Sequence, residues 1–165
     1  MTGMLDVVIR EAVEADAEAA CRVLRRSITE CCIADHCNDQ ELLNAWLRNK
    51  TPENVIAWIT HDNNITRVAV TGNRIVGFAM LQKSGYLALN YILPEVLFQG
   101  VGRALLQALE SAAVELRLHE LTLESTRTAH DFYLRNGFEV SGASETGSGM
   151  ESWLMRKGRD LNTAG

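Results

Sequence analysis

The chain has 165 residues, a formal net charge of −5 and 22% charged residues, as expected of one globular domain with a sizeable core. Charges of both signs are interspersed, which argues against nucleic acid as a partner. No stretch approaches the length needed to cross a bilayer, and the N-terminal residues form no signal-peptide core. We therefore expect no membrane partner, a single domain over residues 1–158 and a polar tail over residues 159–165.

The four cysteines (Cys21, Cys31, Cys32 and Cys37) all lie in one short stretch. A disulfide framework would join distant parts of a small secreted chain, so reduced thiols in a cytoplasmic protein fit this pattern better. The run from Cys31 to Cys37 includes His36, but it has neither paired Cys-x-x-Cys spacing nor a second ligand cluster. The sequence therefore predicts no metal site.

The first third of the chain predicts one strand followed by helices. Residues 7–10 favour a strand, and Asp16 is a suitable N-cap for a helix that runs to about residue 29. Residues 30–39 have poor periodicity and are expected to form a loop. Apolar residues at helical spacing predict a second helix over residues 42–47, and Thr51 followed by Pro52 is typical of the start of a short third helix.

Three strands joined by short turns are expected next. Residues 65–71, 74–82 and 86–93 are rich in β-branched, apolar and aromatic side chains, and turn residues separate them. Such tight connections predict an antiparallel meander.

After Pro94, a glycine-containing turn runs directly into a long amphipathic helix. The turn reads Gln99-Gly100-Val101-Gly102, and apolar residues then recur on one helix face to Leu116. The first N–H groups of a helix have no partner within it, so spaced glycines there let phosphate oxygens approach. A helix start with permissive glycines is the alternative. Leu105 breaks the dinucleotide fingerprint, and the Gly-Lys-Ser/Thr sequence of a P-loop is absent.

The last third predicts a parallel crossover and a final hairpin. Residues 121–124 form a short strand, and a helix opened by Ser125-Thr126 ends at Asn136-Gly137. Residues 138–140 and 151–157 favour two last strands, and residues 142–149 between them are expected to form a mobile segment.

Two stretches resemble signatures of the GCN5-related N-acetyltransferases (GNAT). Leu97-Phe98-Gln99-Gly100-Val101-Gly102 resembles the coenzyme A pyrophosphate loop, Gln/Arg-x-x-Gly-x-Gly/Ala, with Leu97 in place of the leading Gln or Arg. Residues 129–138, from Ala129 to Phe138, resemble the Ala-x-x-Phe-Tyr-x-x-x-Gly-Phe signature. The resemblance implies an α/β (α+β) fold whose central, mixed but mostly antiparallel sheet of about seven strands is flanked by helices on both faces.

The same resemblance implies an acetyl-CoA-dependent N-acetyltransferase without a metal cofactor. Tyr133 would be the general acid for the departing thiolate, since a phenol with a pKa of ~10 holds its proton at neutral pH; an aromatic side chain on the core face is the alternative. A backbone N–H near Ile92 and Leu93 would polarise the acyl oxygen, and Ser125 or Thr126 would hydrogen-bond the pantetheine arm. The turn residues expected to hold the pyrophosphate are Gln99, Gly100, Val101, Gly102, Arg103 and Ala104.

The general base, the acceptor and the oligomeric state stay open. Candidate bases and neighbouring polar groups are Asn90, Tyr91, Glu95, Glu124, Asp35 and His36. Asp35, His36 and Trp46 are also candidates for contact with the amine acceptor, and a homodimer is one option. A non-catalytic acyl-CoA-binding or regulatory protein of the same fold is the alternative function, because Leu97 departs from the motif and no base stands out.

Overall fold

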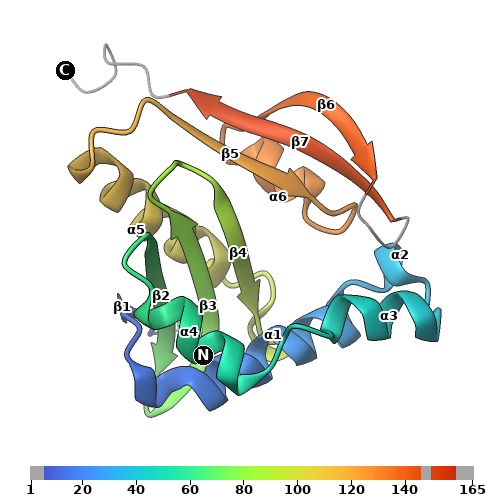
Figure 1. Ribbon diagram of the computed structural model, residues 1–165, viewed down its shortest axis with the longest axis horizontal. Coiled ribbons are helices and arrows are strands. Elements are labelled where there is room, and N and C mark those ends of the chain that lie inside the picture. Colours follow the sequence, from blue (N-terminus) through green and yellow to red (C-terminus); the bar gives the residue numbers. More distant parts are fainter. Residues whose placement is uncertain (1–5, 146–149, 159–165) are drawn as a thin grey trace, which may run out of the picture.

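The computed structural model describes residues 6–145 and 150–158, and its strands form two sheets that splay apart (Figure 1). The first sheet has four antiparallel strands in the order β1-β2-β3-β4, and the second has three in the order β5-β7-β6. The strands are β1 (Val8–Glu11), β2 (Asn64–Thr71), β3 (Arg74–Gln82), β4 (Leu87–Ile92), β5 (Glu120–Ser125), β6 (Glu139–Glu145) and β7 (Glu151–Gly158).

Local signals in the sequence set most of the helix boundaries. The Asp39 carboxylate accepts the N–H groups of Glu41 and Leu42, and the Thr51 hydroxyl accepts that of Asn54, so both residues act as N-caps. The helices are α1 (Ala17–Cys31), α2 (Ile33–His36), α3 (Gln40–Leu47), α4 (Pro52–Thr60), α5 (Val101–Glu115) and α6 (His130–Arg135), with 3₁₀ turns η1 (Glu14–Asp16) and η2 (Pro94–Val96).

The two sheets meet where β4 runs beside β5 in the same direction. Tyr86 and Thr122 form a single parallel bridge, and the Thr122 N–H donates to the Gly85 carbonyl oxygen at 2.9 Å. Beyond this bridge the two strands diverge (Figure 1), and the parallel crossover expected from the sequence is confirmed. The divergence leaves part of the β4 edge unpaired with β5.

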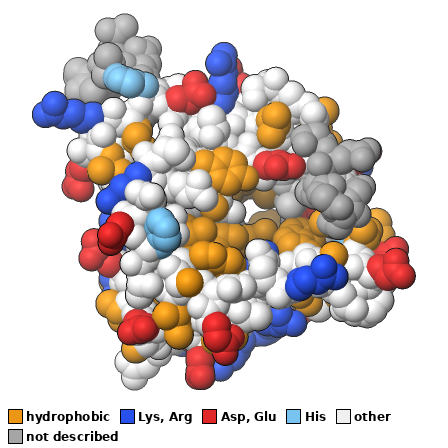
Figure 2. Space-filling model, in the orientation of Figure 1, with side chains coloured by type: hydrophobic (Ala, Val, Ile, Leu, Met, Phe, Trp, Pro, Cys, Tyr) orange, Lys and Arg blue, Asp and Glu red, His pale blue; other side chains and the backbone are white. Residues whose placement is uncertain are grey.

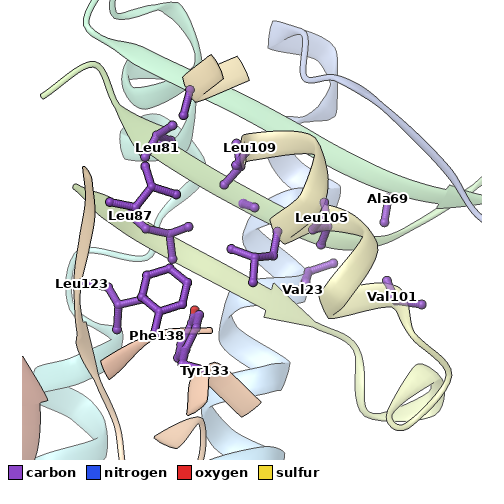
Figure 3. Close-up of a cluster of buried hydrophobic side chains, with 14 of the residues drawn as sticks. Val23, Ala69, Leu81, Leu87, Val101, Leu105, Leu109, Leu123, Tyr133 and Phe138 are labelled. Carbon is purple, nitrogen blue, oxygen red and sulfur yellow. The ribbon is translucent and has the colours of Figure 1, made fainter. Parts of the chain in front are cut away.

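Helices cover both faces of the first sheet, as predicted. On one face α5 lies over β2 and β3, so that Leu105 and Leu109 join Ala69 and Leu81 in one buried cluster (Figure 3). A Cβ built on Gly77 of β3 would lie 2.7 Å from Leu105 Cδ1, so glycine is needed there for close helix–sheet packing.

The opposite face of this sheet carries α1 and α4. The buried side chains of Leu24, Val55, Phe78 and Met80 form the second cluster. Residues 78 and 80 lie on this face and residues 79 and 81 on the other, as strand alternation requires.

Three sequence-based expectations are corrected. Residues 30–39 are not simply a loop, because α1 continues to Cys31 and the short helix α2 follows. Asp16 is the N-cap residue of α1 as expected, but its side chain makes no capping bond to that helix; its carboxylate instead accepts the Val13 N–H at 2.8 Å and pairs with Arg10, which closes the turn η1. Strand β6 extends to Glu145, so much of the segment expected to be mobile is paired with β7. Residues 146–149 and the expected tail at 159–165 lie outside the described residues.

Candidate active site

A cleft of about 840 Å³ occupies the gap between the two sheets. Its walls come from the C-terminal end of α1, the edge of β4, the glycine turn with the start of α5, and α6. Figure 2 shows a hollow in this region bordered by hydrophobic side chains. Seven of the site residues expected from the sequence line it: Ile92, Gly100, Val101, Gly102, Arg103, Thr126 and Tyr133.

The glycine turn leaves unpartnered N–H groups at the N-terminus of α5. Gly100 has φ +82°, and the Ala104 N–H makes the first helical bond, to the Gly100 carbonyl oxygen at 3.0 Å. The N–H groups of Val101, Gly102 and Arg103 therefore have no intrahelical acceptor, and no side chain caps the helix. A Cβ at Gly100 would meet no atom within 4 Å, and one at Gly102 would meet only the Phe132 ring at 3.6 Å. Space for an anion therefore lies in front of these donors.

The edge of β4 presents a second backbone donor. The Leu93 N–H donates to the Val76 carbonyl oxygen at 2.8 Å, so it is used inside the sheet. Donors alternate between the two sides of an antiparallel strand, and Ile92 pairs with Gly77 one position earlier. The Ile92 N–H consequently points away from β3, toward the gap between β4 and β5.

Asn90 lies two residues before Ile92 on the same strand. Its Nδ2 donates to the Gly102 carbonyl oxygen at 3.3 Å, and its buried Oδ1 has no hydrogen-bond partner among the described residues. Buried polar atoms are almost always paired, so the free Oδ1 beside the cleft has the capacity to accept a hydrogen bond from a ligand.

Tyr133 reaches the cleft from α6. The Thr126 hydroxyl accepts the Ala129 N–H at 3.1 Å at the start of this helix, and Gly137, at φ +93°, follows its end. The Tyr133 ring packs edge-to-face on Phe132, with the ring centroids 5.1 Å apart. It packs in the same way on Phe138, with the centroids 5.4 Å apart (Figure 3). Burial raises the pKa of the Tyr133 hydroxyl above its usual range, and the neighbouring Asn90 side chain offsets part of that rise. The phenol therefore keeps its proton at neutral pH.

Four of the expected cofactor-binding residues do not line the cleft. Leu93 is buried in the core, and the Gln99 amide donates to the Glu95 carbonyl oxygen at 3.3 Å. Ala104 follows the turn with its N–H already paired, and the Ser125 hydroxyl is buried and donates to the Thr126 carbonyl oxygen at 2.9 Å.

The candidate bases are engaged elsewhere in the fold. Glu95 pairs with Arg26 at 2.7 Å and with Arg74 at 2.8 Å, and the Arg26 hydrogen bond is the main reason why its pKa falls to about 2. Glu124 accepts the Ser152 hydroxyl at 2.5 Å and does not line the cleft.

Asp35 and His36 of α2 are also engaged. Both Asp35 carboxylate oxygens accept hydrogen bonds from Arg127 and Thr128, in the loop before α6. His36 is fully buried; its Nδ1 accepts the Asn38 N–H, so its Nε2 carries the proton and donates to the Ile28 carbonyl oxygen at 3.0 Å.

Sequence reasoning missed Cys31 and Cys32, which line the cleft at the end of α1. Helix α1 extends further than the sequence predicted and so places both cysteines at the cleft. The helical spacing of Leu24 and Ile28, continued by one turn, reaches these cysteines and was the sequence signal for the longer helix. All four cysteines are free thiols.

Within residues 6–145 and 150–158, no group of three or more His, Cys, Asp or Glu side chains is placed to hold a metal. In the same residues, no helix is long and apolar enough to cross a membrane.

A sequence profile of the family described as "Acetyltransferase (GNAT) domain" matches residues 33–158. The chain belongs to the GNAT acetyltransferase family. The matched segment contains the glycine turn, the β4 edge and Tyr133, so most of the cleft lining belongs to it; Ser27, Cys31 and Cys32 of the lining precede it. No curated protein matches the sequence.

Solved structures share this GNAT fold at low sequence identity. A GCN5-related N-acetyltransferase from Rhodopseudomonas palustris has a TM-score of 0.86 and 21% identity, over 96% of this chain and 99% of that one. The PaiA N-acetyltransferase from Thermoplasma acidophilum, solved with coenzyme A, has a TM-score of 0.82 and 23% identity, over 93% of this chain and 99% of that one. YncA from Salmonella typhimurium, solved with acetyl-CoA, has a TM-score of 0.73 and 19% identity, over 94% and 95% of the two chains.

Proposed function

We propose that this GNAT protein transfers an acetyl group from acetyl-CoA to a primary amine by direct attack in a ternary complex. The observation that carries the proposal is the meeting of three groups in one cleft: the uncapped N-terminus of α5, the outward Ile92 N–H and the Tyr133 hydroxyl. Coenzyme A and acetyl-CoA in the PaiA and YncA structures support the choice of donor.

The glycine turn would hold the pyrophosphate of acetyl-CoA. The free N–H groups of Val101, Gly102 and Arg103 point into open space, and the helix dipole adds partial positive charge there. Arg103 at the start of α5 and Arg135 at the end of α6 both line the cleft and are the only cationic side chains among its described lining residues. These groups take over the polar role that the family motif gives to the residue at Leu97.

The β4 edge would orient the acyl group. The Ile92 N–H donates toward the thioester carbonyl oxygen and stabilises the charge that develops on it when the amine attacks. The unpaired Asn90 Oδ1 accepts an N–H of the pantetheine arm, and the Asn90 amide meanwhile holds Gly102 in place. The Tyr133 hydroxyl donates its proton to the sulfur as the carbon–sulfur bond breaks, and the proton that the attacking nitrogen loses as the amide forms returns to the phenolate through solvent.

A turnover assay tests the proposal. Purified protein is incubated with acetyl-CoA, a thiol-reporting reagent and a panel of amines, and native mass spectrometry records bound coenzyme A. We expect acceptor-dependent thiol release that Tyr133→Phe reduces. Bound coenzyme A without release on any amine would support the non-catalytic alternative instead.

A further inference from the structure

We propose that the Phe98 ring is a stacking platform for the adenine base of the acetyl donor. This inference rests on the proposed acetyltransferase function and deepens it, because it assigns the nucleoside end of coenzyme A to a residue of this chain. The juxtaposition behind it is an almost fully exposed aromatic ring on a left-handed backbone, two residues before Gly100 and in the lining of the same cleft.

Phe98 is the most exposed large hydrophobic residue in the part of the chain that the structure describes. Its relative exposure is 97%, against 63% for Val8, the next in order. The other exposed hydrophobic residues within the described ranges are aliphatic, and none of them lines the cleft. An aromatic ring at the rim of a ligand cleft is thus available to pack on a ligand, which would remove its apolar surface from water.

The backbone at Phe98 has a conformation that disfavours a bulky side chain. Its φ is +62°, in the left-handed region that glycine adopts without steric cost. Because the residue is almost fully exposed, packing against the described part of the chain does not offset this strain. Backbone strain of this kind is concentrated at functional sites. A glycine would suit the turn better, so the phenyl ring serves binding rather than folding.

Neighbouring contacts fix the backbone that carries the ring. The Gln99 amide, directly after Phe98, donates to the Glu95 carbonyl oxygen at 3.3 Å. The Glu95 carboxylate in turn pairs with Arg26 of α1 at 2.7 Å and with Arg74 of β3 at 2.8 Å. The segment around Phe98 is therefore anchored to the first sheet and its helix, so a base that stacks on the ring meets a preorganised surface.

The shape of acetyl-CoA decides which of its parts reaches Phe98. In the proposed complex the pyrophosphate lies on the glycine turn, and the pantetheine arm runs from there to Ile92 and Tyr133. The adenosine is attached to the other end of the pyrophosphate, so it leaves the turn away from the reacting centre. Two residues of chain cover at most about 7 Å, which brings a base attached there within reach of the ring. Adenine has the flat π-face on which an aromatic side chain stacks.

The charges beside the turn suit a phosphorylated nucleoside. Coenzyme A carries a further phosphate on the ribose of its adenosine. A Cβ built on Gly102 would lie 3.6 Å from the Phe132 ring, so this face of α6 lies against the turn. Arg135 lies three residues after Phe132 on the same face and lines the cleft. Asp131 is the one carboxylate among the described lining residues, and water screens it because its side chain is 82% exposed.

Binding of donor fragments is the first test. Calorimetry gives the dissociation constants of coenzyme A and of 4′-phosphopantetheine, which lacks the adenosine, for wild type and Phe98→Gly. We expect Phe98→Gly to bind coenzyme A at least about fivefold more weakly, because the base–aromatic stack is lost, and to bind 4′-phosphopantetheine as wild type does. An equal loss for both ligands would show that the substitution disturbs the glycine turn, and would overturn the proposal.

Two further variants separate the ring from the backbone. Phe98→Tyr keeps the ring and should retain wild-type affinity for coenzyme A. Phe98→Asn accepts the left-handed backbone without an aromatic ring and should bind as weakly as Phe98→Gly. Chemical denaturation should show Phe98→Gly to be at least as stable as wild type, since glycine relieves the strain. A clear loss of stability in Phe98→Gly, or wild-type affinity in Phe98→Asn, would contradict the proposal.

A fluorescent ring at the same position reports the stack directly. Phe98→Trp places an indole at the rim, and subtracting the emission of wild type, with its three tryptophans, isolates the new signal. Coenzyme A and adenosine 3′,5′-bisphosphate should both quench this emission, and 4′-phosphopantetheine should not. Quenching by 4′-phosphopantetheine, or none by adenosine 3′,5′-bisphosphate, would show that the ring does not meet the adenine.

These binding measurements distinguish the inference from the proposed function. Equal affinity of wild type and Phe98→Gly for coenzyme A would overturn the adenine platform and leave the acetyltransferase function intact. Failure of the wild type to bind coenzyme A would reject both. Self-association of the wild type that Phe98→Gly abolishes, with coenzyme A affinity unchanged, would assign the ring to a second copy of the chain instead.

Discussion

The Asp35 carboxylate of α2 accepts the Thr128 hydroxyl of the loop before α6 at 2.5 Å, across 93 residues of sequence. The same carboxylate accepts the backbone N–H groups of Arg127 and Thr128. One side chain thus joins the acceptor side of the cleft to the loop that carries Thr126 and leads to Tyr133.

Replacing Asp35 tests this connection. Asp35→Ala removes hydrogen bonds to a charged acceptor, so we expect a loss of about 1–2 kcal/mol in the free energy of unfolding and a lower kcat as α6 loosens. Asp35→Asn keeps one acceptor oxygen and should lose less. Chemical denaturation and steady-state kinetics measure the two effects. Asp62→Ala, in an exposed turn, is the control, and equal behaviour of Asp35→Ala and Asp62→Ala would refute a structural role.

Tyr133→Phe removes the hydroxyl and keeps the ring that packs on Phe138. We expect kcat to fall about 10²–10⁴-fold, on the order of 2–5 kcal/mol of transition-state stabilisation, with acetyl-CoA affinity nearly unchanged. Tyr86→Phe, which removes a half-buried phenol outside the cleft lining, should retain wild-type kcat. A wild-type kcat for Tyr133→Phe, on an acceptor for which chemistry limits the rate, would remove Tyr133 from the mechanism.

Gly102→Asp places a carboxylate where the pyrophosphate is expected. Its Cβ would make only an ordinary contact with the Phe132 ring, at 3.6 Å, so the protein should fold. We expect acetyl-CoA to bind at least about tenfold more weakly, ~1.4 kcal/mol, because the anion occupies the helix N-terminus. Calorimetry measures this, with Gly158→Asp in open space at the end of β7 as control. Tight binding by a folded Gly102→Asp variant would show that the pyrophosphate lies elsewhere.

Glu95 should affect stability rather than catalysis. Its folded-state pKa of about 2 is depressed below the usual 4.5, so its pairing with Arg26 and Arg74 stabilises the fold fully above about pH 4.5. That contribution is lost as the pH falls from about 4.5 to about 2. The gap in unfolding free energy between wild type and Glu95→Gln should therefore close over this range. A large loss of kcat in Glu95→Gln at neutral pH would instead restore Glu95 as a candidate base.

The cysteines should hold no structural metal. We expect elemental analysis of the purified protein to give far less than one zinc per chain, and a chelator to leave the unfolding temperature unchanged. In the folded protein a thiol reagent should modify exposed Cys37 before buried Cys21 and Cys32. Stoichiometric zinc together with chelator-induced unfolding would overturn this prediction.

The sequence by itself determined the order of the elements and the main site motifs. Some signals lie within a few residues and can be recognised without knowledge of the fold. They are strand alternation, the helix start at Thr51-Pro52 and the glycine turn before α5. For the same reason, Tyr133 and the glycine turn could be recognised from short stretches of sequence. Their meeting in one cleft needed the resemblance to a family, because 31 residues separate Gly102 from Tyr133.

Only the tertiary structure decided which polar side chains and backbone N–H groups are left without a partner inside the fold. Asp35 and Glu95 find partners 92 and 69 residues away, and no local pattern encodes such distant pairs. The choice between the Ile92 and Leu93 N–H groups depends on the register of β4 against β3, because a shift of one residue reverses which donor faces the cleft.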